Sequence, residues 1–589
     1  MSINTTQLYN AFIHGAQTLI AQRQALNAIN VFPVADGDTG TNMASTVEAI
    51  LRYGQLKDGM ADTLASITDA VSMNARGNSG AIFAQFVIGL NETLPDHELN
   101  EKEIIAGLQE AVKRVYSALS HPVEGTMITV MRLWVQELDG LIAKGHDLKE
   151  AFDQALLKAN EVLKDTPNLL TMLKEHHVVD SGAKGFVHFL EGFSKGLFTK
   201  TQPVFTIDEG LLLDDSHIVD ANETITYRYC TEALVEGEID EDLHAQLDAL
   251  GDSVLIVTSH RFTKIHLHTN TPDKVMALLE TRGKLLQQKA DDMILQHADF
   301  SPKAKIALLT DSIADLPTSA ILDHHIHVLP LTILVDGSPY LDRITLPASR
   351  FYDRVTSFTD YPSSSQPNQK AVEAIFKNLL THYEQVLTLT VSSGMSGTHQ
   401  VIQAAAASFD GKVTVIDTKK NSGAQGLLVL QAAQLIREGQ TMEAIIKAIT
   451  TSIPLTHIFV SVDTLKYMVK MGRISPVVGR IAKWVNLKPI VSIDANGKGV
   501  TMGSAFNKKM TEAKILKQLD LLLKTHDLVS YAIVHGNDAQ RAERFTSLLT
   551  EKLGQAPLFV EEVSTIVAMS AGPKTIAVAI QLKEKTAQA

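Results

Sequence analysis

The chain has 589 residues, 45% of them hydrophobic, and a formal net charge of -13 at pH 7. This length is enough for about three or four domains, and the acidic balance argues against a nucleic-acid-binding protein, which needs clustered Lys and Arg. The start of the chain lacks a basic, apolar leader and we find no apolar run of spanning length, so we expect a cytoplasmic protein without a transmembrane segment.

Residues 1–200 are predicted to form an all-α domain, because apolar residues recur at helical spacing from Thr5 to about Gly196. Polar, glycine-bearing segments interrupt this pattern at 36–42, 74–80, 125–129 and 180–185. Segments of this kind can gather at one end of a helical bundle. We therefore expect a bundle with one polar, functional end.

The first of these interruptions reads Asp36-Gly37-Asp38-Thr39-Gly40-Thr41-Asn42-Met43. Two carboxylates one residue apart, glycines that let the backbone approach a ligand, and a helix that starts just after them suit Mg²⁺ and polyphosphate. The alternative is structural, because Asp-Gly-Asp is a common turn composition and such residues often only cap a helix. The spacing alone leaves both interpretations open.

Residues 201–300 change to short alternating segments, which predict a small α+β domain with strands at 224–229, 253–257 and 264–268. His266 and His268 would face the same side of a strand, so they could hold one metal ion with Cys230, the single cysteine of the chain, as a third ligand. A His-x-His pair with a distant cysteine is more often incidental. One cysteine also excludes an internal disulfide.

From Lys305 onward, buried-strand patterns alternate with helical stretches, which predicts an α/β region with largely parallel sheets. The strands are expected at 306–311, 386–390, 413–417, 458–462 and 529–534. A second half is expected to begin near Ile453, which divides this region into lobes of 305–452 and 453–589. In such sheets ligands bind at the carboxyl ends of strands.

The loops of the first domain together resemble the nucleotide-binding component of dihydroxyacetone kinases, the DhaL family. The match is closest to its fatty acid kinase branch, which carries the same Asn-x-Phe-Pro-x-x-Asp-Gly-Asp-Thr-Gly-Thr-Asn-Met run. The resemblance implies an eight-helix barrel that holds ATP and two Mg²⁺ at one end, with Asp36 and Asp38 as catalytic metal ligands. Asn30 lies where dihydroxyacetone kinases have a third aspartate in slightly different spacing, and it is a further candidate ligand. The residues expected around the nucleotide are Asn30, Thr39, Gly40, Thr41, Asn42, Asn78, Ser79, Gly80, Thr126, Asp180 and Gly182.

The middle region resembles the middle domain of fatty acid kinases, on the residues Tyr229-Cys230-Thr231-Glu232 and His266-Leu267-His268-Thr269. The resemblance implies a zinc site at Cys230, His266 and His268. We see no paired general base beside it and favour a structural role. It also implies a homodimer formed through this domain.

The region from 305 to 589 resembles the DegV family, the fatty-acid-binding partners of fatty acid kinases. The matching segments are 310–317, 362–367, 392–398 and 471–475. The resemblance implies that Ser364 and Ser393 hold the head group of a fatty acid and that Arg473 lies near the face presented to the kinase. The chain departs from the family at Ser570, which replaces the histidine of a His-x-Gly-Pro-Gly motif. Ser570 could donate a hydrogen bond, and Lys574 could supply charge.

The resulting hypothesis is a single-chain kinase that phosphorylates the carboxylate of a fatty acid bound by its own DegV part, with ATP and Mg²⁺ as cofactors. The acyl phosphate would feed phospholipid synthesis through downstream acyl-phosphate-using enzymes. Two alternatives stay open: a kinase for a small molecule such as dihydroxyacetone, and a lipid-binding regulatory protein without kinase activity. Neither the chain length of the fatty acid nor the choice between transfer within one chain and across a dimer follows from the sequence.

Overall fold

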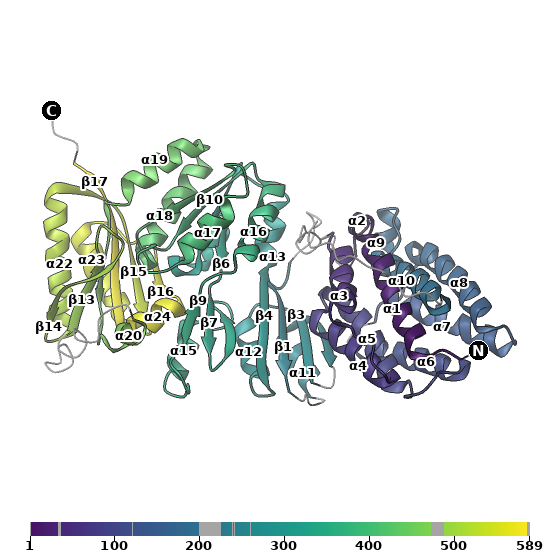
Figure 1. Ribbon diagram of the computed structural model, residues 1–589. Helices are drawn as coiled ribbons and strands as arrows, with labels where there is room; N and C mark the ends of the chain where they lie inside the picture. The colour runs from purple at the N-terminus through teal and green to yellow at the C-terminus, as the bar shows by residue number, and fades with distance from the viewer. Residues whose placement is uncertain are drawn as a thin grey trace. The chain divides into compact units, whose positions relative to one another are not determined.

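The computed structural model describes residues 2–32, 37–119, 122–199, 225–237, 240, 242–258, 261–472 and 488–585. They form two compact units, Met1–Phe300 and Ser301–Ala589 (Figure 1). Asp36 and Arg473 of the predicted sites lie outside the described residues. Among the residues that are described, no helix is both long enough and apolar enough to cross a membrane.

The first unit begins with a closed ring of helices. Within the described residues the helices are α1 (Thr5–Ile20), α2 (Arg23–Asn27), α3 (Thr39–Tyr53), α4 (Met60–Asn74), α5 (Gly77–Thr93), α6 (Glu101–Ser117), α7 (Met127–Ala143), α8 (Leu148–Leu169), α9 (Thr171–Glu175) and α10 (Ser181–Phe198). Eight of these are long, whereas α2 and α9 have five residues each. Each long helix packs against the next, and α10 returns to α1. The predicted eight-helix barrel is confirmed.

Local sequence starts these helices and aromatic packing holds them together. Asn4 forms a capping box with Gln7 at the start of α1, and Asn100 forms one with Glu103 at the start of α6. Inside the ring, phenylalanine and tryptophan side chains meet edge to face, as in the Phe83–Phe189 pair with ring centroids 4.8 Å apart. The further rings of this cluster belong to Phe12, Phe86, Trp134, Phe152, Phe186, Phe193 and Phe198. The barrel interior is therefore a packed core, which leaves its ends for ligands.

The rest of the first unit is an antiparallel sheet with strand order β2-β3-β1-β4. Its elements are β1 (Tyr229–Glu236), α11 (Leu243–Asp248), β2 (Gly251–Thr258), β3 (Phe262–Thr269), α12 (Pro272–Leu279), β4 (Lys284–Asp292) and α13 (Met293–Asp299). The strand predicted at 224–229 is wrong, because β1 begins only at Tyr229 and continues to Glu236. The prediction began too early because polar and apolar residues already alternate before Tyr229.

The sheet packs directly on the barrel. Leu255 and Val257 of β2 belong to the same buried core as the helices. Gln85 of α5 donates a hydrogen bond to the carbonyl of Ile256, and Arg114 of α6 donates one of 3.3 Å to the carbonyl of Thr258. Barrel and sheet are thus parts of one packed unit.

The second unit has two lobes. Its elements are β5 (Ile306–Asp311), η2 (Ser312–Ala314), α14 (Thr318–Asp323), β6 (Ile326–Leu329), β7 (Thr332–Val335), β8 (Ser338–Leu341), α15 (Ala348–Arg354), β9 (Ser363–Ser365), α16 (Gln369–His382), β10 (Gln385–Thr390), α17 (Thr398–Ala406), β11 (Val413–Asp417), α18 (Ser422–Arg437), α19 (Met442–Ser452), β12 (Thr456–Ser461), α20 (Lys466–Lys470), β13 (Lys488–Ile493), β14 (Gly499–Ala505), α22 (Lys508–Thr525), β15 (His526–Gly536), α23 (Ala539–Leu553), β16 (Val560–Glu562), α24 (Thr565–Ala571) and β17 (Thr575–Glu584). One sheet has the order β11-β10-β5-β6, a second β8-β7-β9, and a third β14-β13-β12-β17-β15-β16.

The prediction of largely parallel sheets holds for the first of these sheets only. All its strand pairs are parallel, whereas in the third sheet β12, β13, β14, β15 and β17 pair antiparallel and only the β15–β16 pair is parallel. β17 is buried along most of its length, as a strand of a parallel sheet would be. A continuous apolar run reports burial on both faces and says nothing about strand direction.

Helix α18 joins the two lobes, because it contacts β5 and β10 on one side and β12, β15 and β17 on the other. A Cβ atom at Gly423 would lie 3.2 Å from Val534 and 3.3 Å from the side chain of Ala579. A Cβ atom at Gly426 would lie 2.5 Å from the carbonyl oxygen of Ala314. These two glycines let α18 pack closely between the sheets.

Buried carboxylates also tie the lobes together. Asp342 is fully buried, and it accepts hydrogen bonds from the Ser312 hydroxyl (2.7 Å) and from the Thr565 backbone N–H at the start of α24 (2.8 Å). Asp315 likewise accepts from the Ser564 backbone N–H (2.6 Å). Burial raises the pKa of Asp342 to about 7 and that of Asp315 to about 6.

We expect the stability of this unit to fall as the pH rises from about 4 to about 7. In that interval folded Asp342 keeps a proton that the unfolded chain, with an ordinary carboxyl pKa of about 3.9, has released, so folding is favoured at the acid end. Asp342→Asn should reduce this pH dependence by about 2 to 4 kcal/mol. Urea unfolding at several pH values, monitored through hydrogen exchange of peptides from α24, measures the free energy of unfolding. An equal pH dependence in both proteins would contradict the assignment to Asp342.

Candidate functional site

Four helix N-termini meet at one end of the barrel. Helices α3, α5, α7 and α10 begin after Asp38, Arg76, Thr126 and Asp180. A Cβ atom at Gly77 would collide with the Asn42 amide, so α5 starts against α3. A Cβ atom at Gly182 would lie 3.2 Å from Ser79 Oγ and 3.6 Å from Met127, so α10 starts against α5 and α7. The structure therefore brings the four predicted loops together.

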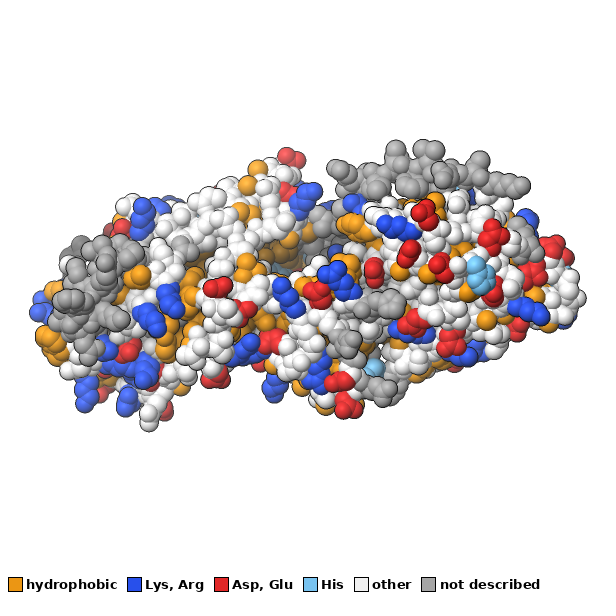
Figure 2. Space-filling model, turned by 60° about the horizontal axis from the view of Figure 1, so that its bottom comes forward, with side chains coloured by type: hydrophobic (Ala, Val, Ile, Leu, Met, Phe, Trp, Pro, Cys, Tyr) orange, Lys and Arg blue, Asp and Glu red, His pale blue; other side chains and the backbone are white. Residues whose placement is uncertain are grey.

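Such a cluster favours an anionic ligand. Helix N-termini carry partial positive charge and free N–H groups. On the face of the first unit that Figure 2 shows at the right, Asp and Glu side chains lie among the Lys and Arg side chains. An anionic ligand at the helix starts would be held by local geometry more than by the net charge of the chain.

The loop before α3 is shaped by amide side chains. Asn30 is buried, and its Oδ1 accepts a hydrogen bond of 2.9 Å from the Thr39 backbone N–H. Asn27, which the sequence did not single out, accepts 2.9 Å from the Thr41 N–H and donates 2.8 Å to the Thr41 hydroxyl. A Cβ atom at Gly40 would overlap the carbonyl oxygen of Arg23. This position therefore tolerates only glycine.

Asp38 is the described carboxylate of this loop. Its Oδ2 accepts a hydrogen bond of 2.6 Å from Asn42 Nδ2 one turn into α3, while the side chain stays half-buried. Hard oxygen ligands of this kind, beside the hydroxyls of Thr39 and Thr41, are what Mg²⁺ prefers. A glycine cradle, helix N–H groups and a carboxylate thus fit a metal–polyphosphate ligand.

The other predicted residues lie at the starts of α5, α7 and α10. Asn78, Ser79 and Gly80 form the first turn of α5, and a Cβ atom at Gly80 would collide with the Thr46 hydroxyl. Asp180 is buried and accepts 2.7 Å from the Ala183 N–H, and burial raises the pKa of Asp180 to about 7. Thr126 donates its hydroxyl to the carbonyl of Val123 (2.8 Å). Asp180 thus caps α10.

A second cluster lies in the antiparallel sheet and contains Cys230, His266 and His268. The register of β1 and β3 pairs Cys230 with His268 and Glu232 with His266, so all four side chains share one face. One ligand atom from each of the cysteine and the two histidines lies within 4.8 Å of the others. The buried Nε2 of His266 has no hydrogen-bond partner among the described residues. His266 Nδ1 lies 3.9 Å from Cys230 Sγ, and a thiol with two imidazoles this close is a donor set that suits Zn²⁺.

Burial and neighbouring groups shift the pKa values of both histidines in this cluster. Although burial opposes its charge, Cys230 and Glu232 raise the pKa of His266 to about 10. Burial, and then the neighbouring His266, lowers the pKa of His268 to about 3. His268 therefore offers a neutral imidazole at physiological pH.

If this cluster binds zinc, we expect Cys230→Ser to lose most of the metal while the fold is kept, because serine is a much poorer ligand than a thiolate. Metal content of the purified protein, measured by mass spectrometry of the elements, tests this. His244→Gln is a matched control, since His244 pairs with Asp248 at a distance from the cluster. Full zinc retention in the Cys230→Ser variant would show that Cys230 is not a zinc ligand.

Glu232 connects this cluster to the barrel end, although its place in a sequence motif predicted no role for it. Its Oε1 lies 3.5 Å from the Gly77 backbone N–H at the start of α5 and 3.6 Å from His266 Nδ1. Its Oε2 lies 2.7 Å from Lys264 Nζ. One carboxylate therefore touches both candidate sites of the first unit.

The second unit contains a cavity of about 670 Å³ between its lobes. Ser364, Ser393 and Ser570 all line it, as predicted for a head-group site, whereas Lys574 does not. Its apolar wall comes from Ile313, Leu331, Val391, Ile458, Val460, Met468, Val491, Ile493, Val534, Ile566 and Val567. A cavity of this size with an apolar wall and one group of polar side chains suits an amphipathic small molecule.

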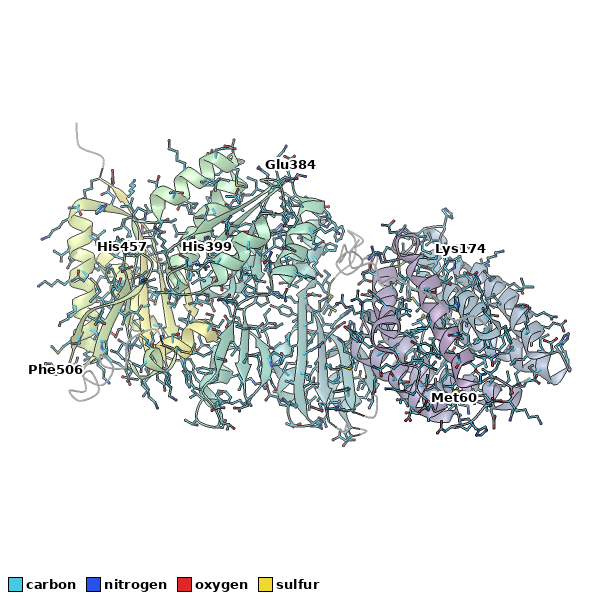
Figure 3. The ribbon with its side chains drawn as sticks, viewed as in Figure 1. Met60, Lys174, Glu384, His399, His457 and Phe506 are labelled. Carbon is cyan, nitrogen blue, oxygen red and sulfur yellow. The ribbon has the colours of Figure 1, made fainter. Side chains whose placement is uncertain are left out.

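One group of polar residues of the cavity comes from the loop after β10. Ser393 donates its hydroxyl to Asp417 Oδ2 (2.5 Å) at the end of β11. His399, labelled in Figure 3 at the start of α17, lies 3.0 Å from the Thr390 hydroxyl through its Nδ1, so its ring is bonded to the sheet. The serines at the carboxyl ends of the parallel strands therefore face the cavity, in line with the rule for α/β sheets.

Comparison with known proteins gives three family matches along the chain. Residues 33–195 match a DAK2 domain, residues 226–300 match the FakA-like middle domain of fatty acid kinases, and residues 305–583 match the DegV family. An uncharacterized protein of Staphylococcus aureus is 33% identical over 315 residues, which cover 51% of this chain and 58% of that protein. A protein of Staphylococcus haemolyticus is 32% identical over 318 residues, covering 52% and 58%. The chain thus spans less than two thirds of these relatives.

Solved structures of DegV proteins are similar to part of the chain. A fatty-acid-binding DegV protein from Thermus thermophilus is 27% identical, with 47% of this chain and 99% of that chain covered and a TM-score of 0.45. DegV from Bacillus subtilis, described as a fatty acid binding protein, is 27% identical, with 48% and 100% covered and a TM-score of 0.44. In chain order, the protein matches a DAK2 domain, a FakA-like middle domain and the DegV family, and these matches agree with the fatty acid kinase architecture that its motifs predicted.

Proposed function

We propose that this protein is an ATP-dependent fatty acid kinase that phosphorylates the carboxylate of a fatty acid held in the cavity of its own second unit. The observation that carries the proposal is the presence, in one chain, of a helix-N-terminus cluster around Asp38 and of a serine-edged apolar cavity. The first suits a metal–polyphosphate ligand and the second a long-chain acid. The kinase family matched by the first unit supports the pairing.

In the kinase site, Asp38 together with Asp36 would hold Mg²⁺, which supplies positive charge to the phosphates of ATP. The N–H groups at the starts of α3 and α5 and the hydroxyls of Thr39, Thr41 and Ser79 would orient the phosphate oxygens. Phosphoryl transfer needs mainly alignment and charge neutralisation. A carboxylate oxygen of the fatty acid attacks the γ-phosphorus, the bond to ADP breaks, and an acyl phosphate results.

In the second unit, Ser364, Ser393 and Ser570 would surround the head group and the apolar wall would hold the alkyl chain. Joining both units in one chain raises their effective concentration for each other, whether transfer runs within one chain or across a homodimer. The Cys230 cluster would bind zinc as a structural ion. The product would serve cytoplasmic enzymes that use acyl phosphates for phospholipid synthesis.

One experiment tests the activity. Purified full-length protein is incubated with ATP, Mg²⁺ and palmitate or oleate, and acyl phosphate is trapped as the hydroxamate with hydroxylamine. Hydroxamate that depends on both ATP and fatty acid supports the proposal. Phosphorylation of dihydroxyacetone without hydroxamate would replace the proposal by a small-molecule kinase. Bound lipid without any product would replace it by a non-catalytic lipid-binding role.

A further inference from the structure

Lys498 is the one charged side chain among the described residues that line the cavity of the second unit. Its ammonium has no hydrogen-bond or ion-pair partner among the described residues, although its backbone N–H donates 2.9 Å to Asp494 Oδ1. The other polar lining residues are neutral: they are serines, threonines, an asparagine and a glutamine. Lys498 is exposed, and a cation at the edge of an otherwise neutral cavity can bind an anion.

The backbone of Lys498 is fixed beside the predicted head-group serines. Lys498 lies at the turn between β13 and β14, and the preceding Gly497 accepts a hydrogen bond of 2.7 Å from the buried Ser392 hydroxyl through its carbonyl. A Cβ atom at Gly394 would lie 2.9 Å from the carbonyl oxygens of both Asn496 and Gly497. The turn of the C-terminal lobe is therefore seated on the 392–394 loop of the N-terminal lobe.

Ser393 by itself is a poor site for an anion. Ser393 has one hydroxyl proton, and it already donates that proton to Asp417. The backbone N–H of Ser393 also points to Asp417, at 3.2 Å. A carboxylate placed beside Ser393 would meet a second carboxylate without a cation between them. Lys498, from the facing lobe, can supply that cation.

We propose that Lys498 binds the carboxylate of the fatty acid and makes the cavity select acids over neutral lipids of the same length. The inference rests on the proposed function only in taking a fatty acid as the ligand. The ammonium pairs with the carboxylate at the polar edge, and the apolar wall binds acid and alcohol chains alike. Selectivity for the acid therefore depends on one side chain.

The test measures equilibrium binding of palmitate and of hexadecanol to the full-length protein at low ionic strength, each below its solubility limit. Lys498→Met should weaken palmitate binding about two- to fivefold, as expected for an ion pair with an exposed ammonium, and leave hexadecanol binding unchanged. Lys498→Arg should restore the preference for palmitate. Lys509→Met is the matched control, since Lys509 is exposed and outside the cavity lining.

Three outcomes would overturn the inference. They are an unchanged acid-to-alcohol ratio in Lys498→Met, an equal loss for both ligands, and a failure of Lys498→Arg to restore selectivity. These outcomes are separate from the failure of the kinase proposal. If the protein binds palmitate selectively through Lys498 but forms no hydroxamate, the role of Lys498 stands and the proposed kinase activity is wrong. A protein that binds neither ligand would remove both.

Discussion

Replacing Asp38 by alanine is expected to abolish ATP-dependent acyl phosphate formation, with a fall in kcat of at least about 10³-fold. Asp38 lies where four helix N-termini meet, and its bond to Asn42 holds it at the start of α3. Without it the phosphates lose a metal ligand, whereas the helix keeps its backbone hydrogen bonds. Hydroxamate formation gives the rate, and circular dichroism checks that the helical content is unchanged.

Asp62→Ala is the matched control for this change, because Asp62 is an exposed carboxylate in the first turn of α4, outside the four-loop cluster. It should keep the activity of the unchanged protein. Equal activity in Asp38→Ala would take the loop out of the kinase mechanism. Loss of helical content in Asp38→Ala would instead make Asp38 a folding residue.

Glu232→Ala is expected to destabilise the first unit by about 3 to 5 kcal/mol, the usual cost of removing one partner of a buried ion pair. The side chains of Glu232 and Lys264 are 10% and 11% exposed, and their charged atoms lie 2.7 Å apart. Although burial opposes the charge of Glu232, Lys264 holds the pKa of this carboxyl well below its usual range. The alanine variant leaves the Lys264 ammonium buried without that partner.

The measurement is urea unfolding followed by the fluorescence of Trp134, in a Trp484→Phe background because the chain has two tryptophans. Trp134 reports on the sheet as well, since the barrel core includes Leu255 and Val257. The double variant Glu232→Met, Lys264→Met removes both charges, and it should recover most of the lost stability. A double variant as unstable as Glu232→Ala would mean that packing, and not the ion pair, sets the cost.

Residue patterns alone predicted much of the barrel end at which the four loops meet. Helical spacing predicted a helical bundle, and the family resemblance implied that it is an eight-helix barrel. The glycine-rich interruptions marked the starts of α3, α5, α7 and α10, because helix starts depend on nearby residues. The His-x-His spacing likewise put His266 and His268 on one face, because side chains alternate along a strand. These features are encoded within a few residues of chain.

Other features depend on which elements pack together, and local patterns do not carry that information. The third sheet of the second unit is antiparallel although its strands look like those of a parallel sheet, because apolar runs report burial and not direction. Asn27 reaches Thr41 because α2 packs beside α3, and Glu232 reaches Gly77 because the middle sheet packs on the barrel.

The chain's sequence by itself determined the domain order, the loop chemistry around Asp38 and the ligand types at Cys230, because each is written in short runs of residues. Only the tertiary structure decided what surrounds them. Lys498 is a lysine in a turn with no motif, and it lines the cavity because its turn is seated on the 392–394 loop of the other lobe. Contacts between distant segments follow from packing of buried surfaces, which no single segment specifies.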